Sequence, residues 1–121
     1  MEEVIERLTK SKESAEANSR SEGRRFGTDW AKRHAEYDGL RRLDQFEFNR
    51  DFWTCAGDHE LLNALARIID PECDDYRSSR EFWEAQAGED YWVRYGPCEE
   101  EFARGFLDGA IEVWNAVRGS V

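Results

Sequence analysis

Acidic side chains recur between Asp70 and Glu81 at the spacing of a calcium-binding loop. Counted from Asp70, an acid occupies positions 1, 3, 5 and 12, as in an EF-hand. Two positions depart from that motif, because Asp75 stands where a glycine makes the sharp turn and Arg77 stands where an aliphatic residue is usual. We therefore predict no metal site, and the alternative is a small metal-responsive protein that binds calcium at residues 70–81. Its candidate ligands are Asp70, Glu72, Asp74 and Glu81.

The cysteines and histidines are too few and too scattered to indicate a metal centre or a catalytic pair. Cys55 and His59 are four residues apart, a spacing that zinc sites use, but no second pair completes a four-ligand site. His34, Cys73 and Cys98 are isolated in the sequence. The chain also lacks a Gly-rich phosphate loop, a Gly-x-Ser-x-Gly nucleophile elbow and a His-Glu-x-x-His motif. We therefore expect a protein that is not an enzyme and that holds no cofactor.

Carboxylates outnumber basic side chains, and the imbalance is greatest in the second half of the chain. The sequence has 27 Asp and Glu against 17 Lys and Arg, which gives a formal net charge of −10. Residues 61–121 hold 13 of these acids and 6 of these bases. Direct binding to nucleic acid is disfavoured, since a protein that displaces counterions from phosphates needs a basic face. We expect a protein partner with a basic surface instead.

Aromatic residues lie among the acidic clusters of this half, as they do at protein-binding surfaces. Carboxylates spaced along a surface can imitate the phosphates of a nucleic acid and occupy a basic groove of another protein. We therefore predict a non-enzymatic inhibitor, immunity or regulatory protein that docks on a basic surface, including one that itself binds nucleic acid. The alternative is an acidic surface that only keeps the protein soluble. The predicted partner-binding residues are Glu72, Asp74, Asp75, Tyr76, Glu89, Asp90, Tyr91, Trp92, Glu99, Glu100 and Glu101.

Length and composition indicate one folded domain with an aromatic core. A chain of 121 residues suffices for a single domain of ordinary size. Five Trp, four Tyr and seven Phe supply side chains that each remove about 150–250 Å² from water when buried. No apolar run reaches the roughly 18 residues of a membrane span. The acidic start lacks the apolar segment of a secretory signal, and three unevenly spaced cysteines favour reduced thiols in a cytoplasm.

Apolar residues at helical spacing predict helices along most of the chain, since only Pro71 and Pro97 interrupt it. Asp58 is the expected N-cap of one helix, and Ser78 with Glu81 forms a capping box at the start of the next. The predicted helices cover residues 2–18, 20–36, 38–46, 60–69, 78–88 and 97–119. Residues 46–52 and 91–95 alternate in polarity and are candidate strands.

These elements predict a mostly α fold, a single compact domain of about five or six helices with at most one short β-hairpin. The helix over residues 2–18 has a weak apolar stripe, whereas the later helices have strong ones. We therefore expect residues 1–19 to form a loosely attached N-terminal helix and residues 20–121 to form the helical domain.

Small residues recur every fourth position on two of the predicted helices. Glycine inside a helix costs about 0.5–1 kcal/mol relative to alanine, so their repetition indicates that backbone clearance is needed. We predict that the two helices cross closely within one core. The alternative is that one ridge faces a ligand or a second subunit, which leaves a homodimer open. The predicted helix-crossing residues are Gly23, Gly27, Ala31, Gly105 and Gly109.

Four segments of the chain resemble a family of small bacterial proteins of unknown function. The segments are 23–31, 40–43, 80–84 and 101–114, and the resemblance spans about residues 20–117. The family shares a Gly-x-x-x-Trp-Ala helix and a C-terminal Phe-x-x-Gly-Phe-x-x-Gly-Ala-x-x-Val-Trp helix; here two residues, not three, separate Gly27 from Trp30. Residues 55–70 depart from the family's pattern. The resemblance implies a bacterial or phage-borne cytoplasmic protein and no known activity.

Overall fold

A computed structural model describes residues 1–54 and 60–121 of the chain. Within these residues it contains seven α-helices, two 3-10 helices and no strand. The elements are α1 (Glu2–Arg33), α2 (Tyr37–Gln45), α3 (Arg50–Trp53), α4 (Glu60–Ile69), α5 (Tyr76–Ala87), α6 (Tyr91–Tyr95), η1 (Gly96–Cys98), α7 (Glu99–Val117) and η2 (Arg118–Ser120). The predicted mostly α, single-domain fold is confirmed.

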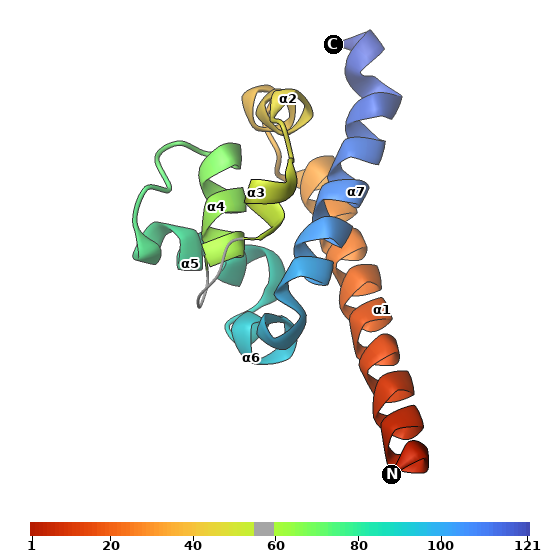
Figure 1. The fold of residues 1–121 in the computed structure, drawn as a ribbon. Coiled ribbons are helices and arrows are strands. Elements are labelled where there is room, and N and C mark those ends of the chain that lie inside the picture. The colour runs from red at the N-terminus through yellow and green to blue at the C-terminus, as the bar shows by residue number, and fades with distance from the viewer. Residues whose placement is uncertain (55–59) are drawn as a thin grey trace.

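The two longest helices, α1 and α7, lie side by side (Figure 1). They run in the same direction, because Gly23 lies against Phe102 and, one turn further along both helices, Gly27 lies against Phe106. Figure 1 shows α2–α6 gathered on one side of this pair. A parallel pair needs a long connection, and α2–α6 supply it by returning the chain to the level at which α7 starts.

Glycines of α1 permit this close approach. A Cβ on Gly23 would lie 2.9 Å from the carbonyl carbon of Phe102, and a Cβ on Gly27 would lie 2.7 Å from that of Phe106. Real Cβ atoms essentially never come within 3.0 Å of such atoms. The backbone of α7 therefore occupies the space that a side chain at either position would need.

Glycines of α7 have the reciprocal role. A Cβ on Gly105 would lie 2.9 Å from the carbonyl carbon of Arg20, and a Cβ on Gly109 would lie 2.8 Å from the backbone nitrogen of Thr28. All four predicted glycines thus lie in one contact, which we call the glycine seam (Gly23, Gly27, Gly105 and Gly109). Ala31, the fifth predicted position, is half-buried against the core beyond it.

Ion pairs between α1 and α7 flank the glycine seam. Arg20 donates to Asp108 over 2.7 Å and to Glu101 over 3.3 Å, and Arg24 pairs with Glu112. The Asp108 hydrogen bond is the main cause that raises the pKa of the Arg20 guanidinium. Each exposed pair contributes about 0–1 kcal/mol, so the pairs set the register of the helices more than their stability.

Aromatic side chains fill the space between the helix pair and α5. Trp83 is fully buried, its ring centroid lies 4.9 Å from that of Phe106, and its indole N–H donates to the Leu62 carbonyl of α4 over 2.9 Å. Phe102 is also fully buried and stacks on Tyr95 of α6 at 4.4 Å. The core therefore depends on large rings from α5, α6 and α7, as the composition predicted.

Several local predictions need correction. The helix predicted from Ser78 begins half a turn earlier, because the Asp75 carboxylate, not a Ser78–Glu81 capping box, accepts the Ser78 N–H over 2.7 Å. Neither candidate strand forms. Residues 91–95 are helical as α6, and the 46–52 segment enters the short helix α3, because short alternating runs do not distinguish strands from single helical turns. The predicted N-cap Asp58 lies outside the described residues.

The N-terminal segment is also arranged differently from the prediction. Residues 1–19 do not form a separate helix, because α1 continues without a break from Glu2 to Arg33. None of residues 1–18 is buried, and the first half of α1 extends beyond the other helices in Figure 1. Val4 and the exposed Ile5 and Leu8 lie on this extension.

Alanine substitution in the glycine seam tests the close approach of the helices. Gly→Ala inside a helix ordinarily stabilises by about 0.5–1 kcal/mol. Gly27→Ala and Gly109→Ala should instead lower the free energy of unfolding by about 1–3 kcal/mol, since each new methyl group meets backbone that must move away. Urea unfolding followed by circular dichroism measures the change. Gly119→Ala is the control, because a Cβ there has no neighbour within 4 Å. Two seam variants as stable as the control would contradict a close crossing.

Candidate partner-binding site

The acidic cluster at the start of α7 is used inside the protein. Glu99 accepts the Leu62 backbone N–H in the first turn of α4 over 3.3 Å, where a carboxylate compensates the unpaired amides of a helix N-terminus. Glu100 pairs with Arg104 at 3.6 Å within α7. Glu101 pairs with Arg20 across the helix pair, as described above. Each of the three carboxylates therefore already has a partner within the protein.

Two of the predicted aromatic anchors are packed within the protein. Tyr91 is only 3% exposed, and its burial is the main cause that raises the pKa of its phenol to about 12. Trp92 is half-buried and packs on Gly96, where a Cβ would lie 2.7 Å from the indole ring. Tyr91 therefore does not lie on the surface, contrary to the prediction. Tyr76 does, with 49% of its surface exposed.

The remaining predicted acids lie in the two turns that flank α5. Asp75 caps α5, and Asp90 lies 3.9 Å from Arg94. Glu72, Asp74 and Glu89 are exposed. Some acids of these two turns therefore have partners within the protein, and others are exposed to solvent.

The alternative calcium ligands do not converge. Asp70 accepts the Glu72 backbone N–H over 2.9 Å, and Glu81 pairs with Arg77 at 3.1 Å along α5. Among the described residues, which include all of 70–81, no group of three or more His, Cys, Asp and Glu side chains is placed to hold a metal ion. The Cys55–His59 pair lies outside the described residues.

A cavity of about 460 Å³ lies where the end of α1, the start of α2 and the end of α4 meet. Four carboxylates line it together with a single guanidinium and one imidazole. The aromatic rings of Trp30 and Phe82, 6.2 Å apart in an edge-to-face arrangement, line it as well. We call this site the acidic cavity; its residues with ionisable side chains are His34, Glu36, Asp38, Arg42, Asp70 and Glu72.

Contacts between α2 and α4 bring these acids together. Arg42 donates to the Ile69 carbonyl at the end of α4 over 2.9 Å, a favourable position for a cation at a helix C-terminus. Gly39 packs on the same residue, since a Cβ there would lie 3.5 Å from the Ile69 carbonyl oxygen. The first turn of α2 is thereby held against the turn that carries Glu72.

Of the acids in this cavity, only Glu72 belongs to the predicted partner-binding set. Glu36 and Asp38 lie at the start of α2, where an acid is expected on helix-capping grounds alone. Nothing in their spacing relates them to Glu72. The sequence does not indicate the two aromatic residues of the cavity either, because Trp30 and Phe82 also belong to the apolar stripes of their helices.

Comparison of the chain with protein-family models, with curated proteins and with solved structures finds no match. The resemblance to small bacterial proteins therefore stays a prediction. None of the helices in the described part of the chain is both long and apolar enough to cross a membrane.

The cap of α5 predicts a specific acid sensitivity. The Ser78 N–H holds the pKa of the Asp75 carboxyl below its ordinary value. This carboxylate therefore stabilises the fold above the pKa of an unfolded Asp, and the contribution is lost as the pH falls through the folded value. We expect Asp75→Asn, which keeps the acceptor but not the charge, to lose less stability on acidification than the parent. Urea unfolding over a pH series measures this, with Asp74→Asn as control. Equal pH dependence of parent and Asp75→Asn would contradict it.

Calcium should leave the protein unchanged. Mass action stabilises a folded protein by about 2.7 kcal/mol at a hundredfold excess of ligand over its dissociation constant. Because the acids of residues 70–81 do not converge, we expect the same melting temperature in millimolar calcium and in EDTA. Differential scanning calorimetry makes the comparison, and a calcium-dependent rise that Glu81→Gln abolishes would favour the metal-responsive alternative.

Proposed function

We propose that this protein is a non-enzymatic binding module that docks its acidic cavity on a basic surface of a protein partner. The observation that supports this proposal best is the cavity itself, which four carboxylates, one guanidinium and two aromatic rings line together. A bacterial cytoplasm, indicated by the unevenly spaced cysteines and by the resemblance, is part of the proposal.

The chemistry of the cavity favours a Lys or Arg side chain of the partner. A carboxylate attracts either cation, and a guanidinium can bond one in a bidentate manner. An aromatic face adds about 0.5–2 kcal/mol when it contacts the cation. Hot spots of protein interfaces are commonly single Arg or aromatic side chains in such recesses. A long basic side chain that enters the cavity would meet both kinds of group.

Exposed acids around the cavity would extend the contact. Asp74 and Tyr76 follow Glu72 along the chain and are exposed. A partner that inserts a cation beside Glu72 would therefore meet a further carboxylate and an aromatic ring. This arrangement suits a groove that ordinarily binds phosphates, so an inhibitor that imitates nucleic acid is the form of the module that we favour.

Two double variants of equal charge separate a specific site from a general acidic field. Glu36→Lys with Glu72→Lys reverses two acids of the cavity. Glu3→Lys with Glu13→Lys reverses two exposed acids of α1 outside it. Binding of a short Arg-Gly repeat peptide is measured by isothermal titration calorimetry at low and at physiological salt. We expect the cavity variant to bind roughly tenfold more weakly and the control to lose much less.

The salt series supplies a second criterion. At physiological ionic strength the Debye length is about 8 Å, so attraction between distant charges is screened. Direct contacts of the peptide within the cavity should persist at this salt concentration. Affinity should therefore fall with salt but stay measurable for the parent and for the control variant. Equal losses in both double variants, or no binding by the parent, would contradict the proposal.

A further inference from the structure

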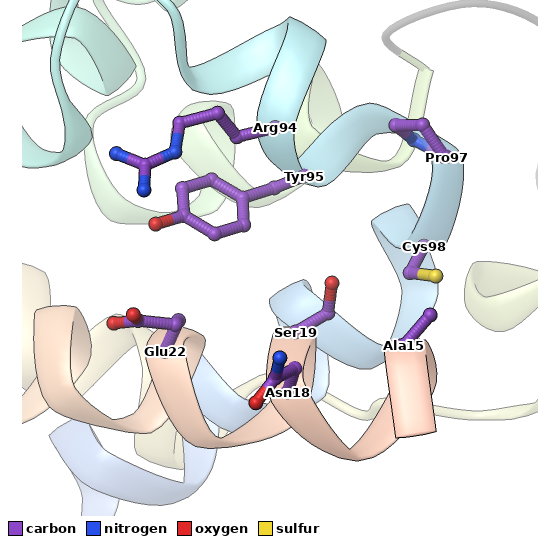
Figure 2. A pocket seen from close by; sticks show the side chains of 8 residues that line it. All are labelled: Ala15, Asn18, Ser19, Glu22, Arg94, Tyr95, Pro97 and Cys98. Carbon is purple, nitrogen blue, oxygen red and sulfur yellow. The ribbon is translucent and has the colours of Figure 1, made fainter. Parts of the chain in front are cut away.

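A second cavity, of about 300 Å³, lies between α1 and the α6–η1 segment. Figure 2 shows Arg94, Tyr95, Pro97 and Cys98 on one wall and α1 on the other. Small-molecule sites begin at about this volume. The cavity shares no lining residue with the acidic cavity, so what it binds is independent of the function proposed above.

The Ser19 hydroxyl is directed into this cavity without a protein partner. Ser19 is only 6% exposed, and Figure 2 shows its oxygen pointing from α1 toward the opposite wall. A serine inside a helix commonly bonds the carbonyl four residues earlier. Among the described residues, none forms a hydrogen bond with the Ser19 side chain. The hydroxyl oxygen itself is accessible from the cavity, so a polar ligand there can bond it directly.

Opposite charges line the same cavity from its two walls. Glu22 of α1 accepts one hydrogen bond from Arg25 Nε over 2.8 Å and forms an ion pair with the same guanidinium at 2.7 Å. Both contacts are at Oε2, which leaves Oε1 for another donor. Arg94 of α6 lies 3.9 Å from Asp90, and its guanidinium carbon lies over the Tyr95 ring, 5.8 Å from the ring centroid. Tyr95 lies between the two charges in Figure 2. Burial and then the Glu22 charge raise the pKa of its phenol, so this group stays neutral and can donate or accept.

This combination excludes most simple ligands. A plain anion would face the Glu22 carboxylate, and a plain cation would face the Arg94 guanidinium. A molecule with both charges close together satisfies both walls. The Ser19 hydroxyl can then form a hydrogen bond with a polar group of this molecule. Ala15 and Pro97 line a less polar part of the cavity, where the side chain of the ligand fits. We propose that this cavity binds a free α-amino acid, with its carboxylate toward Arg94 and its ammonium group toward Glu22.

The two cysteines of the described chain report on binding without any substitution. Cys98 lines the cavity and is half-buried, whereas Cys73 is buried and does not line it. Each natural amino acid is added at millimolar concentration, and iodoacetamide labelling of each cysteine is followed by peptide mass spectrometry. We expect at least one amino acid to slow labelling of Cys98 severalfold while the rate at Cys73 changes less. Thermal unfolding in its presence should show a higher melting temperature.

Molecules that carry only one of the two charges, together with matched variants, test whether the cavity binds an amino acid. Acetate and methylammonium each supply one charge, and neither alone should protect Cys98. Ser19→Ala and Arg94→Gln should weaken the effective amino acid by roughly tenfold. Ser21→Ala on the same helix and Arg77→Gln on α5 are the controls and should change it little. The proposal is wrong if no amino acid protects Cys98, if acetate protects it equally, or if Ser19→Ala binds as Ser21→Ala does.

Discussion

The close approach of the α1 and α7 backbones is the constraint on which the other features depend. At the glycine seam each helix occupies the space of the other's missing side chains, so neither can slide or separate without losing contact along two turns. Such proximity brings Cα–H groups to carbonyl oxygens, a weak interaction that recurs at tight helix crossings. The free energy gained from this contact between the helices has to exceed the conformational cost of four helical glycines. Flanking arginines then allow one register, in which Arg20 meets Asp108.

The seam also fixes where the two cavities lie. Ser19 and Glu22 precede Gly23 on α1 and face the α6–η1 segment, whereas Trp30 and His34 follow Gly27 and line the acidic cavity. Both cavities therefore lie against one helix, at opposite ends of its contact with α7. Neither Trp83 nor Phe106 lines either cavity, because both rings are fully buried against each other in the core.

The strong negative charge has two different roles. Carboxylates of α7 pair with arginines of α1 and with an amide at the start of α4, so these acids have partners within the fold. Carboxylates in the turns around α2 and α5 are exposed or line the acidic cavity, and these are the ones on which a binding function can depend. Net charge alone does not separate the two groups, because each acid counts equally toward −10 whether or not it has an intramolecular partner.

The sequence by itself determined the longer helices of the second half and the crossing residues, since apolar period and glycine spacing are local properties of the chain. It did not determine the short helices α3 and α6 or the continuity of α1. Gly23 and Gly109 could be assigned to a crossing because glycine is costly in a helix without one. Local pattern did not determine the burial of Tyr91 or the partner of Glu99, which lies 37 residues away at Leu62. Nor could local pattern place Glu36 and Glu72 in the same cavity. Only the tertiary structure decided these, because they follow from how helices distant in sequence pack on the α1–α7 pair.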